Sequence, residues 1–354
     1  MPRIELPISK SIANRLLILQ AIHGDGLMTV SADLPEDVLI LHNALTTLRT
    51  FKTSKTLPTP HINVGNCGTA MRFLTAYCAQ LEGQTTILDG VERMHHRPIG
   101  QLVDALREIG AQIEYLGEEG FPPLRIKGCI LDKHRIVTIN NPQSTQFVSA
   151  LLLIGANVHT DSTSPYITLT HEIIKQWGDA AEYTSPLIGG VGGGFIEKDW
   201  SSAAFWYEYV ALHGGEITLP GLCRNSLQGD KVVADIFATL GVQTYYTTNG
   251  VVISSSPLHP TPYTLHHDFV ACPDLYPAVA LTCERLGIQL HATGVESLPL
   301  KESDRLRAVA EHRTDADHRM AMALLIAGYE VDDTACISKS YPCFLDHLRQ
   351  LYEK

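Results

Sequence analysis

Ser9-Lys10-Ser11-Ile12-Ala13-Asn14-Arg15-Leu16-Leu17-Ile18-Leu19 is the stretch of sequence that decides the fold. A short polar turn leads here into a segment whose apolar residues recur with the spacing of a helix. The same pattern returns along the chain, and one residue can mark each copy. These markers are Lys10, Gly68, Ser144, Ser201, Asp274 and Asp317. Such repetition predicts stacked or rotated copies of one small unit.

Short segments between these helices predict strands, because they combine β-branched and other apolar residues with polar neighbours. The segments are residues 112–115, 137–139, 216–219 and 251–254. Helices that alternate with strands indicate the α/β class.

The residues that open the predicted helices have two explanations. Ser, Thr, Asn and Asp are good N-caps, and capping alone can account for about half of these positions. The alternative is that several helix N-termini direct their N–H groups into one cleft and bind an anion there.

Length and composition limit the possible classes of protein. A chain of 354 residues exceeds the roughly 250 to 300 residues at which single cores stop growing, so two domains are expected. The longest apolar run, residues 147–156, is far shorter than the ~20 residues of a membrane-spanning helix. A formal charge of −11 argues against nonspecific binding to nucleic acid or to anionic membranes. Any anionic ligand therefore needs locally gathered Lys and Arg side chains.

The sequence contains no motif that predicts disulfide bonds, a metal site or a cofactor site. The 8 cysteines form no C-x-x-C pair, which predicts free thiols and a cytoplasmic protein. The pairs His95-His96 and His266-His267 lack the spacing of a zinc site, so no metal is expected. The glycine-rich run 189–194 does not complete a nucleotide-binding G-x-G-x-x-G, and no phosphate-loop motif occurs, so no cofactor is expected.

Six blocks of residues, spread over nearly the whole chain, carry a family resemblance. The blocks are Leu6-Pro7-Ile8-Ser9-Lys10-Ser11-Ile12-Ala13-Asn14-Arg15, Asn66-Cys67-Gly68-Thr69-Ala70-Met71-Arg72, Arg93-Met94-His95-His96-Arg97-Pro98-Ile99, Lys301-Glu302-Ser303-Asp304-Arg305, Asp317-His318-Arg319-Met320-Ala321-Met322 and Lys339-Ser340-Tyr341-Pro342. The first block resembles L-P-G-S-K-S-x-S-N-R, with Ile8 and Ala13 departing from it, and the next two resemble N-A-G-T-A-M-R and R-M-x-x-R-P-I. In this order, the blocks resemble the motifs of the EPSP synthases, a family of enolpyruvyl transferases.

The resemblance implies a two-domain α/β enolpyruvyl transferase fold. Each domain would be built from three βαβαββ-like units around a central interdomain cleft. The first domain would comprise residues 9–223, and the second would combine residues 1–8 with residues 224–354. A cytoplasmic monomer that transfers the enolpyruvyl group of phosphoenolpyruvate to shikimate 3-phosphate, in aromatic amino acid biosynthesis, is the implied function.

Phosphoenolpyruvate carries a phosphate and a carboxylate, which Arg guanidinium groups match in pairs of hydrogen bonds. The resemblance implies that it is bound by Lys10, Asn66, Gly68, Arg97, Gln146, Arg305, Arg319 and Lys339. Gly68 would let the backbone approach the ligand, although a turn glycine that needs a positive φ explains it equally well.

Shikimate 3-phosphate adds hydroxyl groups to a phosphate and a carboxylate, so its site should mix cations with hydroxyl and amide groups. The implied residues are Lys10, Ser11, Arg15, Ser144, Thr145, Gln146, Thr163, Tyr166, Asp274, Ser297 and Lys301. Thr145 and Thr163 replace serines of the family pattern and keep the hydroxyl. Ser297 replaces an asparagine.

The reaction needs a proton on the methylene carbon of phosphoenolpyruvate, attack by the 5-hydroxyl, and loss of phosphate from a tetrahedral intermediate. The resemblance assigns Asp274 to orient and deprotonate the 5-hydroxyl, and Glu302 with Lys10 to relay the proton to carbon. Lys301, Arg305 and Arg319 would stabilise the anionic groups. A charged turn such as 301–305 is more often a solvated loop, which is the alternative here.

Two rival functions remain. The UDP-N-acetylglucosamine enolpyruvyl transferases share the fold but carry a reactive Cys before the Arg-Pro, where this chain has Met94-His95-His96. A non-catalytic homologue is the other rival, because the connections near 189–194 and 311–315 are short.

Overall fold

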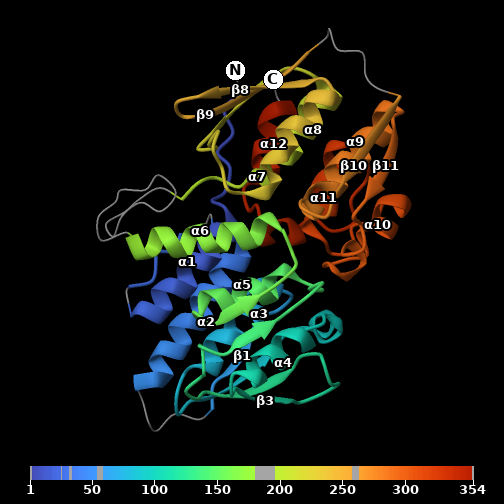
Figure 1. Cartoon of the computed structure of the whole chain (residues 1–354). Helices are drawn as coiled ribbons and strands as arrows, with labels where there is room; N and C mark the ends of the chain where they lie inside the picture. The colour runs from blue at the N-terminus through green and yellow to red at the C-terminus, as the bar shows by residue number, and fades with distance from the viewer. Residues whose placement is uncertain are drawn as a thin grey trace. The chain divides into compact units, whose positions relative to one another are not determined.

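In a computed structural model of the chain, residues 2–24, 26–31, 34–53, 59–179, 196–256 and 263–352 are described (Figure 1). The glycine-rich run 189–194 lies outside them. Among the described residues, no helix combines the length and the apolar character that crossing a membrane requires.

Residue contacts divide the chain into two compact units. The C-terminal unit comprises Met1–Lys10, Ser31–Glu36 and Ile196–Lys354, and the N-terminal unit comprises Ser11–Val30 and Asp37–Phe195. Residues 196–223, which the sequence analysis assigned to the first domain, thus pack within the C-terminal unit. The reason is helix α7 (Trp200–His213), whose aromatic side chains belong to the core of that unit.

The N-terminal unit contains one complete βαβαββ unit. Its elements are β1 (His61–Asn63), α3 (Gly68–Ala79), β2 (Thr85–Asp89), α4 (Gly100–Glu108), β3 (Gln112–Tyr115) and β4 (Leu124–Lys127). The sheet order is β1-β2-β4-β3, in which β1 and β2 are parallel and the other pairs antiparallel.

A second, smaller sheet in this unit repeats the parallel crossover. Strand β5 (Ile136–Thr138) is joined to the parallel strand β6 (Asn157–His159) by α5 (Thr145–Leu153). The remaining elements are α1 (Lys10–His23), α2 (Glu36–Thr53), the 3-10 helix η1 (Glu92–His96) and α6 (Pro165–Asp179). Helix α5 packs against both α3 and α6.

The C-terminal unit contains an antiparallel sheet of order β7-β9-β8, followed by a parallel pair β10-β11. Helix α9 (Tyr276–Leu286) makes the crossover between the parallel strands. Its other elements are α7, β7 (Glu216–Pro220), η2 (Gly229–Val232), α8 (Val233–Thr239), β8 (Val242–Thr247), β9 (Gly250–Ser255), β10 (Thr264–Asp268), η3 (Pro273–Leu275), β11 (Gln289–Thr293), η4 (Leu298–Leu300), α10 (Arg305–Glu311), α11 (His318–Ile326), η5 (Ala335–Lys339) and α12 (Phe344–Tyr352).

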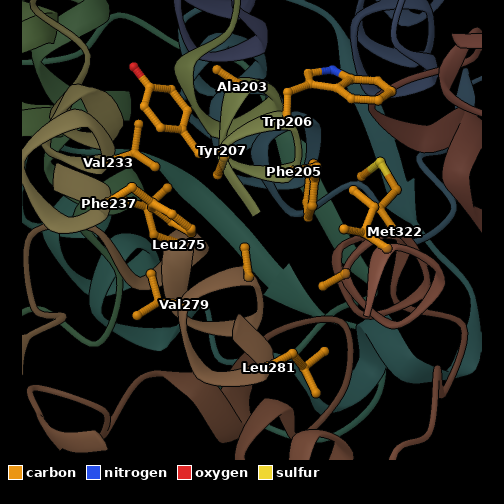
Figure 2. Packing of buried hydrophobic residues seen from close by; sticks show 14 of the residues in the cluster. Ala203, Phe205, Trp206, Tyr207, Val233, Phe237, Leu275, Val279, Leu281 and Met322 are labelled. Atoms are coloured by element: carbon orange, nitrogen blue, oxygen red, sulfur yellow. The ribbon is translucent and has the colours of Figure 1, made fainter. Parts of the chain in front are cut away.

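The core of the C-terminal unit forms where α7, α8, α9 and α11 meet. Figure 2 shows Trp206 and Phe205 from α7 close to Met322 of α11, and Tyr207 close to Phe237 of α8. Helix α7 is buried on nearly all sides, because few of its residues are polar.

The predicted α/β class is confirmed, and so are the predicted strands, which correspond to β3, β5, β7 and β9. Helices also begin within two residues of each predicted marker, at Lys10, Gly68, Thr145, Trp200, Tyr276 and His318. The short connection near residues 311–315 is present in the structure. All residues between α10 and α11 are described, and they form no strand. His312, Asp315 and Ala316 all adopt a positive φ in this connection, which is a strained conformation for residues other than glycine.

Candidate active site

Arg305, the first residue of α10, is the centre of an ion-pair cluster in the C-terminal unit. Its Nε lies 2.8 Å from Oδ2 of Asp317, its Nη1 2.8 Å from Oδ1 of Asp274, and its Nη2 3.0 Å from Oε2 of Glu302. The Arg305 side chain is only 1% exposed. Burial alone would lower the pKa of Arg305, but these carboxylates raise it above the usual value. A permanently charged guanidinium therefore fixes the positions of the acids around it.

Three further cations bind the same carboxylates. Arg319 Nη2 lies 2.8 Å from Oδ2 of Asp274, and Lys301 Nζ lies 3.3 Å from Oδ1 of Asp274. Lys339 Nζ lies 3.1 Å from Oε1 of Glu302. Positions predicted from separate sequence blocks are thus brought together, and the solvated-loop alternative for 301–305 does not describe this cluster.

Asp274 has an unusual electrostatic environment. Burial raises its pKa, but the charges of Arg319, Lys301 and Arg305 outweigh burial and hold the pKa well below the usual range. The Asp274 carboxylate is therefore ionised. It is a weak base as long as it remains paired with these three cations. An anionic ligand that bound these cations would withdraw them from Asp274 and raise its pKa.

Asp317 and His318 belong to the motif 317–322, but the resemblance implied no role for either residue. Asp317 caps α11 by accepting a hydrogen bond from the backbone N of Arg319 at 2.9 Å, and it also accepts one from Ser303 Oγ at 3.2 Å. One carboxylate thus positions both Arg305 and the start of the helix that carries Arg319.

His318 is fully buried beside these charges. Burial lowers the pKa of His318 well below its usual value, and the positive charges of Lys10 and Arg319 act in the same direction. Neither ring nitrogen has a hydrogen-bond partner among the described residues. A neutral imidazole can donate at one nitrogen and accept at the other, so His318 is an additional candidate for contact with a ligand.

Lys10 belongs to the same unit by residue contacts and begins helix α1. Its backbone N donates a hydrogen bond to Oδ2 of Asp199 at 3.2 Å. The positive charge of Lys10 is one of the charges that lower the pKa of His318. Ser297 precedes η4, the turn that leads to Lys301, and is partly exposed.

In the N-terminal unit, Asn66, Gly68 and Arg97 come together at the start of α3. Arg97 Nη1 donates to the backbone O of Asn66 at 3.1 Å and to its Oδ1 at 3.3 Å. A Cβ atom on Gly68 would lie 2.5 Å from Arg97 Nη2 and even closer to Arg72 Nη1. Two guanidinium groups therefore converge on Gly68, and Arg72 is a second residue to which sequence reasoning gave no role.

Gly68 does not have a positive φ, so the turn-conformation explanation for this glycine is wrong. What requires glycine is the approach of Arg72 and Arg97. Like charges this close favour an anion between or beside them.

The start of α5 lies next to the start of α3 (Figure 1). Gln146 Nε2 donates to Thr69 Oγ1 at 2.9 Å. Ser144 caps α5 by accepting from the backbone N of Gln146 at 3.3 Å, and Thr145 is the first residue of the helix. Capping explains Ser144 locally and leaves a binding role as a prediction.

Arg15 is buried and bonded entirely to neutral groups. It donates to Thr170 Oγ1, Ser149 Oγ, Ser11 O and Tyr166 O at 2.7 to 3.1 Å. Burial lowers the pKa of Arg15 to about 10. Arg15 thus fixes the backbone of Ser11 and Tyr166, two further predicted ligands. Thr163, which lies two positions before the start of α6, is exposed to solvent.

The comparisons with known proteins agree with one another. A family model described as EPSP synthase (3-phosphoshikimate 1-carboxyvinyltransferase) matches residues 2–312 and 309–348. The 3-phosphoshikimate 1-carboxyvinyltransferase of Bacteroides fragilis is 37% identical over 408 residues, covering 98% of this chain and 94% of that protein. The corresponding protein of Cellvibrio japonicus is 32% identical over 414 residues, covering 98% and 96%.

Solved structures show the same fold. A structure of EPSP synthase from Acinetobacter baumannii superimposes with a TM-score of 0.65 at 20% identity, covering 98% of this chain and 95% of that one. The Bacteroides alignment extends over more positions than the 354 residues of this chain. The Bacteroides relative therefore carries internal segments that this chain lacks.

Proposed function

The chain belongs to the EPSP synthase (3-phosphoshikimate 1-carboxyvinyltransferase) family, and on this basis we propose that it transfers the enolpyruvyl group of phosphoenolpyruvate to the 5-hydroxyl of shikimate 3-phosphate. Phosphate is the second product. Among the structural observations, the cluster around Arg305 supports this assignment most strongly, since it combines anion-binding cations with two acids suited to proton transfer.

The proposed reaction is an addition followed by an elimination. Glu302 receives a proton from Lys10 and delivers it to the methylene carbon, and the 5-hydroxyl oxygen attacks the adjacent carbon while Asp274 accepts the hydroxyl proton. The carbon–oxygen bond to phosphate then breaks, and the departing phosphate takes the proton that Asp274 had accepted. Glu302 removes a proton from the new methyl group to restore the double bond. Lys10 assists the relay through Glu302.

The ion pairs suggest how Asp274 becomes a base. Anionic groups of the substrates compete with Asp274 for Arg305, Arg319 and Lys301, and each cation withdrawn raises the pKa of Asp274. Substrate binding would thus convert a weak base into a stronger one in the complex where it is needed.

The binding assignments follow the sequence analysis. Phosphoenolpyruvate is bound by Lys10, Asn66, Gly68, Arg97, Gln146, Arg305, Arg319 and Lys339, and Arg72 joins this set because it converges on Gly68. Shikimate 3-phosphate is bound by Lys10, Ser11, Arg15, Ser144, Thr145, Gln146, Thr163, Tyr166, Asp274, Ser297 and Lys301. The protein acts as a cytoplasmic monomer without a cofactor.

A choice of acceptors tests the proposal against its rivals. The protein is incubated with phosphoenolpyruvate and either shikimate 3-phosphate or UDP-N-acetylglucosamine, and products are detected by mass spectrometry. Enolpyruvyl product from the first acceptor alone is expected. Product from the sugar nucleotide alone would assign the rival transferase activity, and product from neither would favour a non-catalytic homologue.

A further inference from the structure

The backbone that carries Lys10 is tied to a second segment of the C-terminal unit at several points. Ile8 forms an antiparallel bridge with Lys198, and Ser9 N donates to Glu197 O at 2.8 Å. Ser9 Oγ donates to Gln228 Oε1 at 2.9 Å, and Ser9 is completely buried. The Ser9 hydroxyl is therefore the side-chain contact that joins the residue before Lys10 to Gln228.

Gln228 is held in a single orientation. Its Oε1 accepts from Ser9 Oγ and from Trp200 N at 3.2 Å, while its Nε2 donates to Glu197 Oε2 at 2.9 Å and to Lys198 O at 2.8 Å. Turning the amide over would direct its oxygen at a carboxylate and a carbonyl, and its NH₂ group at a backbone N–H. Every donor and acceptor of this amide is thus used.

Glu197 anchors Gln228 in turn. The carboxylate is 0% exposed and accepts from Trp200 Nε1 at 2.9 Å, Cys223 N at 3.0 Å, Ser226 Oγ at 2.8 Å and Gln228 Nε2. No Lys, Arg or His side chain of the described residues pairs with it, so neutral donors alone compensate its burial. A buried acid of this kind is costly unless all its hydrogen bonds are made, so the network has one stable arrangement.

We infer that Glu197 and Gln228 are positioning residues, which act through the Ser9 hydroxyl to fix the point from which the Lys10 side chain extends. This inference rests on the proposed function for its effect on turnover, because Lys10 is there the partner of Glu302. Catalytic groups must be held closely, and a displacement of about 1 Å can cost on the order of 100-fold in rate.

A pair of matched variants tests the inference. Ser9→Ala deletes the hydroxyl that connects the network to Lys10. Ser226→Ala deletes a hydroxyl from the other side of the same network, where it contacts Glu197 and Gln228 N but not the Lys10 segment. We expect both to lose similar thermal stability, and Ser9→Ala to lose about 10- to 100-fold in kcat, more than Ser226→Ala, which keeps the contact between Ser9 and Gln228. Ser9→Thr, which keeps a hydroxyl, should retain more activity than Ser9→Ala. Equal kcat in Ser9→Ala and Ser226→Ala would overturn the inference.

A double variant and a chemical probe complete the test. If Ser9 acts through Lys10, Ser9→Ala should reduce residual turnover no further in a Lys10→Met background; an undiminished loss there would contradict us. Reductive methylation followed by peptide mass spectrometry measures the rate at which the Lys10 amine is labelled. This rate depends on the environment of Lys10 and does not require catalytic turnover. A labelling rate that changes more in Ser9→Ala than in Ser226→Ala is expected, and unchanged rates in both would overturn the inference even if the proposed reaction is correct. An inactive wild-type protein with the expected labelling would instead refute only the proposed function.

Discussion

Asp317 and Arg305 form a buried ion pair in which the carboxylate Oδ2 lies 2.8 Å from the guanidinium Nε. The two side chains are 0% and 1% exposed. Asp317 also caps α11, so the helix start that presents Arg319 and the guanidinium that holds Asp274 and Glu302 share one carboxylate. The geometry of the proposed catalytic acids therefore depends on a residue that need not touch a substrate.

Asp317→Asn should destabilise the protein by about 3 kcal/mol, because it leaves a buried guanidinium with less compensating charge. Asn still caps a helix well, so the loss measures the ion pair and not the cap. Asp304→Asn is the control, since Asp304 caps α10 and forms no ion pair with a buried cation among the described residues. Denaturant unfolding should show a change within ~0.5 kcal/mol for Asp304→Asn. Equal effects of the two substitutions would refute this account of Asp317.

Glu302→Gln keeps the size of the side chain and one acceptor oxygen but cannot carry a proton. Turnover should fall by roughly 10² to 10⁴-fold, while calorimetry shows shikimate 3-phosphate bound about as before. Lys301→Ala should instead weaken binding of this anion, because it removes a cation. Near-wild-type turnover in Glu302→Gln would end the assignment of Glu302 as the proton relay.

Gly68→Ala should raise the KM for phosphoenolpyruvate by about tenfold, since the methyl group displaces the guanidinium groups of Arg72 and Arg97. Inhibition by glyphosate, the inhibitor for which the EPSP synthase family is known, should weaken further. The KM for shikimate 3-phosphate should change little. Steady-state rates with each substrate varied in turn make the comparison. An unchanged KM for phosphoenolpyruvate would mean that these arginines do not bind it.

Glu208 in α7 is fully buried, and neither of its carboxylate oxygens has a hydrogen-bond partner among the described residues. Burial raises the pKa of Glu208 well above its usual value of 4.5. The folded protein therefore binds this proton more tightly than the unfolded chain. Its contribution to stability is full below the usual pKa and declines as the pH rises toward the folded-state pKa, by up to ~1.4 kcal/mol per pH unit.

Glu208→Gln should remove this decline. The variant should melt at a higher temperature than the wild type at pH 8 and differ less at pH 4.5. Glu216→Gln, at an exposed position at the start of β7, is the control and should not alter the pH dependence. A Glu208→Gln melting curve that follows the wild type at both pH values would show that folding does not raise the pKa of Glu208.

Sequence pattern was sufficient for the elements that depend on neighbouring residues. Capping and apolar periodicity act within a few positions, which is why the helix starts at Gly68 and next to Ser144 and Asp317 were predictable. The motif resemblance predicted that cations such as Arg305 and Arg319 and the acids Asp274 and Glu302 belong to one functional site. The pairing among them was not predictable, because Arg305 and Asp274 are 31 residues apart and meet only when α10 packs near α9.

The same limit applies to the residues without a predicted role. Ser9 and Gln228 are 219 residues apart, and nothing local to either one indicates the other. Arg72 and His318 lie inside the motifs of the resemblance, but the approach of Arg72 to Gly68 and the complete burial of His318 are properties of the packed chain. The last segment of the C-terminal unit begins at Ile196 because α7 packs into the core of that unit. The spacing of the sequence repeats does not predict this packing.

The central claim is that this chain joins phosphoenolpyruvate to shikimate 3-phosphate by addition and elimination. The most direct measurement mixes the protein with both substrates in D₂O and follows phosphate release together with the NMR spectrum of the product. We predict one phosphate per enolpyruvyl ether formed, release only when both substrates are present, and deuterium in the methylene group of the product, because the proton delivered to carbon exchanges with solvent through Glu302. Folded protein that released no more phosphate with both substrates than with phosphoenolpyruvate alone would contradict the claim.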